Sequence, residues 1–230
     1  MNLFYSHNVN VENAYIITIK GNETSEKYSN VCQQSCKNID MPYTVWDAFN
    51  GTKNPIIVPE HSKNSDIIDS LKITNHYLTR TEVCCFLSHI SLWIRCVKID
   101  QPIVILEHDA IMIRKFTQMK KLNSIVWLGS MEWNRINPIP LHGTDGPNNH
   151  FIARAHAYAL DPMAAKNLLS YVVNNGINTS ADCFIRADLF NISHQGLYAT
   201  DHIIPEIHKT TITNRIKEGE IKKRNDNLEF

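Results

Sequence analysis

The stretch QPIVILEHDAIMI, residues 101–113, decides how the rest of the sequence is interpreted. Its four apolar residues, IVIL, run directly into Glu107, His108 and Asp109, after which the chain turns apolar again. A compact apolar run of this length is typical of a buried β-strand. In open parallel α/β sheets, ligands bind at the carboxyl ends of the strands. We therefore expect a buried strand whose end carries two acids and a histidine at a binding edge.

Strand-like and helix-like patterns alternate on both sides of this stretch. A strand, a helix and a second strand at the start of the chain indicate a parallel βαβ unit. The clearest helix starts at Thr79, which has capping-box spacing to Glu82 and precedes an apolar stripe at helical spacing. Asp161 followed by a proline is typical of another helix start, and Gly176 of its end. We expect strands at residues 14–19, 43–49, 103–106, 125–129 and 151–160, and helices near 22–39, 79–97 and 162–174.

The composition is that of an ordinary globular protein. The chain has 230 residues, 43% of them apolar and 20% charged, and its formal net charge is zero. The zero charge argues against a nucleic-acid partner, and no apolar run approaches the roughly 18 residues that a membrane span needs. We expect one domain over residues 1–230, with a core at 14–205 and a loose polar tail at 215–230.

Cysteine usage and the N-terminal sequence bear on the compartment. The six cysteines show no CxxC pair and no framework spacing. The N-terminal sequence lacks the basic start and long apolar core of a signal peptide. We therefore expect free thiols and a cytoplasmic protein, with a zinc site or disulfides as the less favoured alternative.

Two carboxylates separated by one residue can both reach a hard divalent cation where the backbone turns. Oxygen ligands suit Mg²⁺ or Mn²⁺, and such an ion can also hold a diphosphate. Glu107 and Asp109 are therefore candidate metal ligands. The alternative is that the strand simply ends in a polar loop, because the acid-x-acid spacing is common by chance.

The motifs around this pair resemble those of a known family. TEVCCFLSHISLWIRCV (81–97) followed by PIVILEHDA (102–110) resembles glycosyltransferase family 25, which includes lipooligosaccharide and collagen galactosyltransferases. Weaker pieces extend the resemblance, in order, over residues 14–205. The residues that match the central motifs are Glu82, Cys85, Leu87, Ser88, His89 and Trp93 in the helix and Leu106, Glu107, Asp109 and Ala110 at the strand end.

The resemblance implies a GT-A-like α/β fold, with a mostly parallel central sheet flanked by helices. It implies transfer of galactose or glucose from a UDP-sugar to a glycan or other hydroxyl acceptor, with inversion at the anomeric carbon. Mn²⁺ or Mg²⁺ would be held by Glu107 and Asp109, with His208 or His202 as a late third ligand, and Asp182 would be the base. The short chain and its EHDA motif resemble compact phage and marine microbial members, which implies action in the host cytoplasm if the protein is viral.

Further residues are candidate substrate contacts, each with a structural alternative. Asp47 and Gly51 follow the second expected strand, where they would contact the base or ribose, or else form a turn in which Gly51 has positive φ. Asp182 has the alternative role of a helix cap. The remaining candidates are Ser88 and His89 beside the apolar stripe, where a structural histidine is the alternative, Trp133 as a platform for sugar, and Tyr158 on the polar face of a strand.

Two departures from the family pattern keep rival functions open. His108 replaces the usual middle acid, and KGNETSEK (20–27) stands where the family has an Arg-rich stretch. These differences keep open a non-catalytic module that binds sugar nucleotides or glycans. A metal-dependent phosphoesterase or nuclease is the weaker rival, because a two-metal site needs more clustered acids and histidines than this sequence shows.

Overall fold

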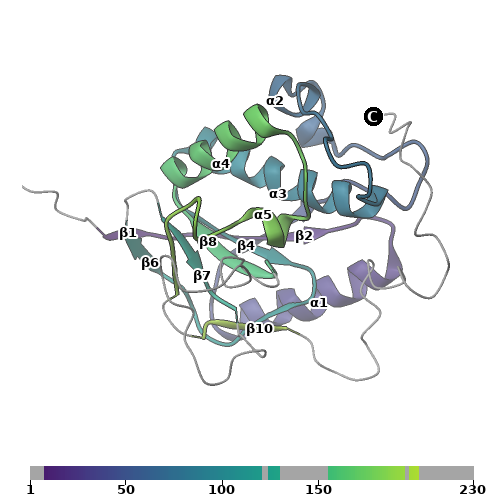
Figure 1. Ribbon diagram of the computed structural model, residues 1–230. Coiled ribbons are helices and arrows are strands. Elements are labelled where there is room, and N and C mark those ends of the chain that lie inside the picture. Colours follow the sequence, from purple (N-terminus) through teal and green to yellow (C-terminus); the bar gives the residue numbers. More distant parts are fainter. Residues whose placement is uncertain (1–7, 121–123, 130–154, 195–196, 202–230) are drawn as a thin grey trace, which may run out of the picture.

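The computed structural model describes residues 8–120, 124–129, 155–194 and 197–201, and its centre is a six-stranded sheet (Figure 1). The strands of this sheet, in spatial order, are β3 (Tyr43–Asp47), β2 (Ala14–Thr18), β4 (Ile103–Glu107), β8 (Ala157–Leu160), β7 (Ile125–Trp127) and β9 (Ile192–His194). Strand β8 is antiparallel to both of its neighbours. The other pairings, β3 with β2, β2 with β4 and β7 with β9, are parallel.

Helices cover both faces of this sheet (Figure 1). Helix α1 (Glu23–Asn38) lies on one face, and α3 (Arg80–Ile99), α4 (Pro162–Asn175) and the short α5 (Ala181–Phe184) lie on the other. Between β3 and α3 the chain forms a 3-10 turn (Glu60–Ser62) and the short α2 (Asp66–Asp69). The predicted α/β architecture, with a mostly parallel central sheet flanked by helices, is confirmed. Among the described helices, none combines the length and apolar character needed to cross a bilayer.

The sheet separates two apolar cores, because successive side chains of a strand point to opposite faces. In β4, Ile103 and Ile105 pack in the core that contains α3 and α4, whereas Val104 and Leu106 pack in the core that contains α1. The same alternation directs the last residue of the strand, Glu107, toward α3. The pleat of β4 therefore determines that this carboxylate contacts α3 and not α1.

Four short strands lie outside the main sheet and were not predicted. Strand β1 (Asn8–Asn10) pairs with β6 (Gln118–Lys120), and β5 (Ala110–Met112) pairs with β10 (Ala199–Asp201), both antiparallel. Three residues are too few to show a hydrophobic period. The β4–β5 connection matters for the site, because its two-residue turn consists of His108 and Asp109.

The predicted helix starts are confirmed by their hydrogen bonds. The Thr79 hydroxyl accepts from the backbone N–H of Glu82, and the Glu82 carboxylate accepts from the backbone N–H of Thr79, which completes a capping box. At the start of α1, Asn22 Oδ1 accepts from the backbone N–H of Ser25. Asp161 Oδ1 accepts from two N–H groups of α4, each at 2.8 Å, and α4 ends at Gly176 with φ of 73°.

Some predicted boundaries are wrong. The strand expected at 151–160 begins only at Ala157, because residues 155–156 form a turn and 151–154 lie outside the described residues. The strand expected at 43–49 ends at Asp47. The expectation of free thiols holds, since all six cysteines are unpaired.

Loss of the capping box should destabilise the fold, because α3 then begins with unsatisfied backbone donors. We expect Thr79→Ala to lower the free energy of unfolding by about 1 kcal/mol, measured by urea denaturation. Thr117→Ala is the matched control, because Thr117 is exposed and lies outside the helices. An equal loss in both variants would contradict a specific capping role for Thr79.

Candidate active site

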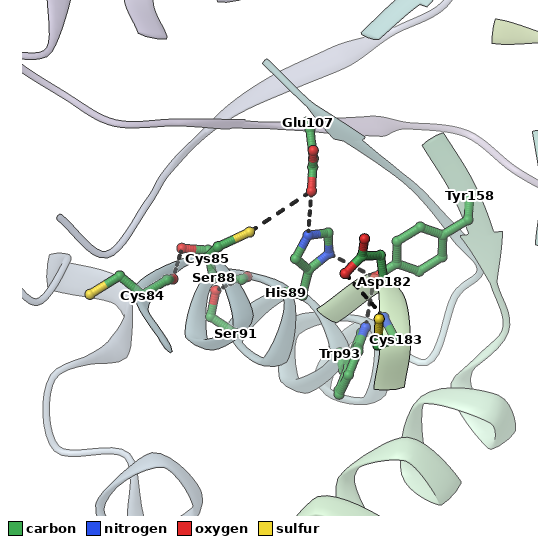
Figure 2. Close-up of polar contacts among 10 residues, drawn as sticks. All are labelled: Cys84, Cys85, Ser88, His89, Ser91, Trp93, Glu107, Tyr158, Asp182 and Cys183. Atoms are coloured by element: carbon green, nitrogen blue, oxygen red, sulfur yellow. Dashed lines mark hydrogen bonds and ion pairs between the residues drawn. The ribbon is translucent and has the colours of Figure 1, made fainter. Parts of the chain in front are cut away.

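The candidate site lies where the parallel strands β2, β3 and β4 end, at the edge predicted from the sequence. Glu107 is the last residue of β4, and its side chain points toward α3 (Figure 2). Glu107 Oε1 accepts a hydrogen bond from His89 Nε2 at 3.2 Å and a weaker one from Cys85 Sγ at 3.9 Å. The Glu107 side chain remains 28% exposed, so the carboxylate is anchored from the protein side and open on the other.

His89 is held in turn by two residues behind it. Its Nδ1 lies 2.9 Å from the Tyr158 hydroxyl, and Trp93 Nε1–H donates to the same hydroxyl at 2.9 Å (Figure 2). His89, Trp93 and Tyr158 are all fully buried. The residues Cys85, His89 and Trp93 follow one another at intervals of four in α3, so they form one stripe on the helix.

Burial changes the interpretation of three predicted substrate contacts. His89 and Tyr158 bond to each other and have no exposed surface, so neither side chain is accessible to a substrate. Ser88 is also buried: its hydroxyl donates to the Cys84 carbonyl and accepts from the Phe49 N–H at 3.0 Å. Ser88 thus ties the segment after β3 to α3, which is a structural role.

The two acids of the EHD motif differ in electrostatic environment. Burial raises the pKa of Glu107, but the hydrogen bond from His89 and the nearby imidazoles outweigh it, so the pKa lies below its usual value. Burial and the negative charge of Glu107 raise the pKa of Asp109 above its usual value. Asp109 Oδ1 is buried without a hydrogen-bond partner among the described residues.

Asp182 lies near the same site but comes from α5. It occupies the first turn of that helix, and its Oδ1 accepts from the N–H of Cys183 at 3.1 Å (Figure 2). The N-cap position belongs to Ser180, so the helix-cap alternative for Asp182 is wrong. Its carboxylate is close enough to Cys85 to raise the pKa of that thiol.

The pKa of the Cys85 thiol therefore depends on the acids near it. Burial, followed by the negative charges of Glu107, Asp182 and Asp109, raises the pKa of the Cys85 thiol well above its usual value. Three of the acids that the sequence singled out, Glu107, Asp109 and Asp182, thus lie close enough to this thiol to raise its pKa. Sequence reasoning matched Cys85 to a motif but gave it no role, although its spacing of four residues from His89 could have placed the two on one helix face.

Two different sets of side chains at this position are candidate ligands for a metal ion. Single ligand atoms of Cys85, His89 and Glu107 lie within 4.8 Å of one another, and Asp109 does not belong to this group. Sulfur with imidazole and carboxylate is typical of Zn²⁺. Both His89 nitrogens are hydrogen-bonded, however, one to the Tyr158 hydroxyl and the other to Glu107 itself. We therefore interpret the group as hydrogen bonds that orient Glu107.

The carboxylate oxygens offer the second donor set. Glu107 and Asp109 supply the hard oxygen ligands that Mg²⁺ and Mn²⁺ prefer. A buried acceptor without a partner costs about 1–3 kcal/mol. Asp109 Oδ1, which has no partner in the described part of the chain, is such an acceptor, and a cation would satisfy it. The residues present therefore fit a hard divalent ion.

The segment after β3 contains the other predicted contacts. Asp47 ends β3 half-buried, and its carbonyl oxygen lies 2.8 Å from His61 Nε2. The His61 ring stacks on Trp46 with 3.9 Å between centroids, a feature that the sequence did not reveal. Gly51 lies in a turn, as the structural alternative predicted, but its φ is not positive. A Cβ there would lie 2.9 Å from the carbonyl oxygen of Arg80, so close packing against α3 explains the glycine.

Some predicted residues cannot be placed in the site. Trp133, His202 and His208 lie outside the described residues. Trp127, the other tryptophan of this part of the sequence, is buried in β7 and belongs to the core.

The electrostatics of Cys85 can be tested by its reactivity, because the thiolate is the nucleophile. We expect slow alkylation of Cys85 by iodoacetamide at pH 7.5 and faster alkylation in Glu107→Gln or Asp182→Asn. Each unit of fall in the thiol pKa raises the thiolate fraction about tenfold while most of the thiol is protonated. Site-resolved mass spectrometry measures the rates.

Asp69→Asn is the control for these variants, because Asp69 is an exposed acid on α2. An unchanged Cys85 rate in both site variants would show that the acids do not act on this thiol.

Comparison with known proteins gives a match to a protein family. The family model for glycosyltransferase family 25, described as LPS biosynthesis protein, matches residues 11–139. A search of curated proteins gave no match. Among solved structures, the galactosyltransferase LgtC in complex with donor and acceptor sugar analogues aligns with a TM-score of 0.46 and 8% identity, over 84% of this chain and 87% of that chain. This likeness is too distant to assign an activity.

The family match covers more than half of the chain and includes both α3 and β4, which carry Cys85, His89 and Glu107. The protein therefore belongs to glycosyltransferase family 25 and is a glycosyltransferase.

Proposed function

We propose that the protein is a metal-dependent, inverting glycosyltransferase that moves galactose or glucose from a UDP-sugar to a glycan or other hydroxyl acceptor. The observation that carries this proposal is the position of Glu107 at the carboxyl end of β4, where His89 anchors it and where Asp109 and Asp182 act with it on the pKa of the Cys85 thiol. Glu107 is anchored by His89, Asp109 has a buried oxygen with no partner among the described residues, and Asp182 comes from a separate helix. These differences support different roles for the three acids.

Glu107 and Asp109 are the proposed ligands of Mn²⁺ or Mg²⁺. The ion would neutralise the charge that develops on the departing nucleoside diphosphate. A third ligand from the late histidines remains part of the proposal. The His108 ring stacks on Tyr28 of α1, with 5.9 Å between centroids and 16° between planes. Because this ring packs on α1, the proposal assigns the metal contacts of the motif to the two outer acids and none to His108.

Asp182 is the proposed base. An inverting transfer needs a group that takes the proton of the acceptor hydroxyl while the leaving group departs from the opposite side. Asp182 comes from α5, on a different element from the metal-binding turn, which supports a role on the acceptor side. Asp47 and the backbone near Gly51 remain proposed contacts of the nucleotide, since they follow β3 at the same sheet edge.

A donor panel tests the proposal most directly. We expect one UDP-hexose, among UDP- and GDP-sugars, to release nucleoside diphosphate with Mn²⁺ and not with EDTA. Glu107→Gln and Asp109→Ala should each lose most of this release, because each removes a proposed oxygen ligand. Release is measured by coupled detection of the diphosphate, and exposed Asp69→Asn serves as the control.

The outcomes separate the enzyme from its rival. Metal-dependent binding of a UDP-sugar without any release or transfer would support the non-catalytic binding module. Full release in EDTA would contradict the metal role, and full release by Asp109→Ala would contradict the ligand assignment.

Asp182 needs its own test. We expect Asp182→Asn to lower kcat for transfer by about 10²- to 10⁴-fold, because general base catalysis contributes on that order. Binding of UDP with Mn²⁺, measured by calorimetry, should stay unchanged. NMR of the product should show inversion at the anomeric carbon in the wild-type reaction. Retention, or a kcat for Asp182→Asn equal to that of Asp69→Asn, would contradict the assigned base.

A further inference from the structure

Resting on the proposed metal role of Glu107, we infer that Trp93, Tyr158 and His89 are positioning residues, whose hydrogen-bond chain fixes the direction in which the Glu107 carboxylate meets its ligand. The chain runs from Trp93 Nε1 to the Tyr158 hydroxyl, from that hydroxyl to His89 Nδ1, and from His89 Nε2 to Glu107 Oε1 (Figure 2). The distances along it are 2.9, 2.9 and 3.2 Å.

The donor at one end sets the direction of every bond. An indole N–H can only donate, so the Tyr158 oxygen accepts from Trp93. The Tyr158 hydroxyl then has its own proton to donate to His89 Nδ1. A neutral imidazole that accepts at Nδ1 carries its proton on Nε2, and this proton points at Glu107. A single neutral tautomer of His89 therefore satisfies all three bonds.

The hydrogen-bond chain is held rigidly because its residues come from three packed elements. His89 and Trp93 lie on α3, whereas Tyr158 lies on β8, which pairs with the strand that carries Glu107. The His89 and Tyr158 rings stack with 5.8 Å between centroids and 21° between planes. Since Trp93, Tyr158 and His89 are fully buried, no water competes for their hydrogen bonds.

The chain also assigns different tasks to the two carboxylate oxygens. His89 and Cys85 both contact Oε1. Within the described part of the chain, no hydrogen bond engages Oε2, and the side chain is open to solvent on one side. Oε2 is therefore the atom left to contact a cation. A carboxylate free to rotate would present this atom in many directions and bind the cation less tightly.

The test is a set of conservative variants in which Mn²⁺ binding is measured directly. Tyr158→Phe removes one hydroxyl and keeps the ring. His89→Gln keeps an amide N–H that can reach Glu107, whereas His89→Leu keeps none. Tyr171→Phe is the matched control, because it removes a tyrosine hydroxyl on α4, in the aromatic cluster with Phe184 and Phe190. The Mn²⁺ dissociation constant is read by electron paramagnetic resonance with UDP present, and the melting temperature is recorded for each variant.

Loss of an outer partner of a metal ligand typically costs about 10- to 100-fold in metal affinity or activity. We expect the Mn²⁺ dissociation constant to rise by about 10-fold or more in Tyr158→Phe and further in His89→Leu. His89→Gln should recover part of the loss, and Tyr171→Phe should match wild type. Trp93→Phe, at the far end of the chain, should show the smallest rise.

Two outcomes would overturn the inference in distinguishable ways. If Tyr158→Phe and His89→Leu melt at lower temperature but bind Mn²⁺ with wild-type affinity, the chain is structural only. If wild type itself binds no Mn²⁺ with UDP, the metal role in the proposed function fails, and the inference that rests on it fails too. The first result comes from the variants and the second from wild type alone.

Discussion

The hydrogen bond from His89 to Glu107 joins helix α3 to the end of strand β4, and the arrangement of the site depends on it. The bond is possible only because the pleat of β4 turns Glu107 toward α3, while Ile103 and Ile105 fill the core beneath. On the helix, a spacing of four residues brings Cys85 and His89 to the same carboxylate. The two-residue period of the strand and the four-residue spacing on the helix therefore together place Cys85 and His89 beside Glu107 Oε1.

The hydrogen-bonded residues His89 and Tyr158 lie inside an apolar core, and a comparison of interaction energies indicates why. A typical hydrogen bond contributes about 0.5–1.5 kcal/mol to stability, whereas full burial of one large apolar side chain contributes about 1.5–3 kcal/mol. Apolar residues in place of His89 and Tyr158 could thus stabilise the packing of α3 at least as well. Hydrogen bonds differ from apolar contacts in being directional. The polar chain is therefore better explained by the orientation it imposes on Glu107 than by the stability of the fold.

The sequence predicted the larger elements well, because the patterns that define them are local. The apolar run before Glu107 marked β4, and the spacing of Thr79 to Glu82 marked the start of α3. It predicted the acids of the site as individual residues but not their shared environment around Cys85, which depends on how α5 packs against α3. The buried bond between His89 and Tyr158 also escaped prediction, since it joins residues 69 positions apart. Pairings between distant segments leave no periodic signal within either segment.

The turn between β4 and β5 directs two acids that are close in the sequence toward different helices. Glu107 faces α3, whereas Asp109 lies near α1, where its charge raises the pKa of Tyr28 together with burial. His108 lies between them in the sequence and stacks on Tyr28, and its positive form lowers the pKa of both acids. An acid at this position would add a third negative charge to a turn that is already repulsive. Because the positive form of the histidine relieves part of that repulsion, it favours the ionised forms of Glu107 and Asp109 before any cation binds.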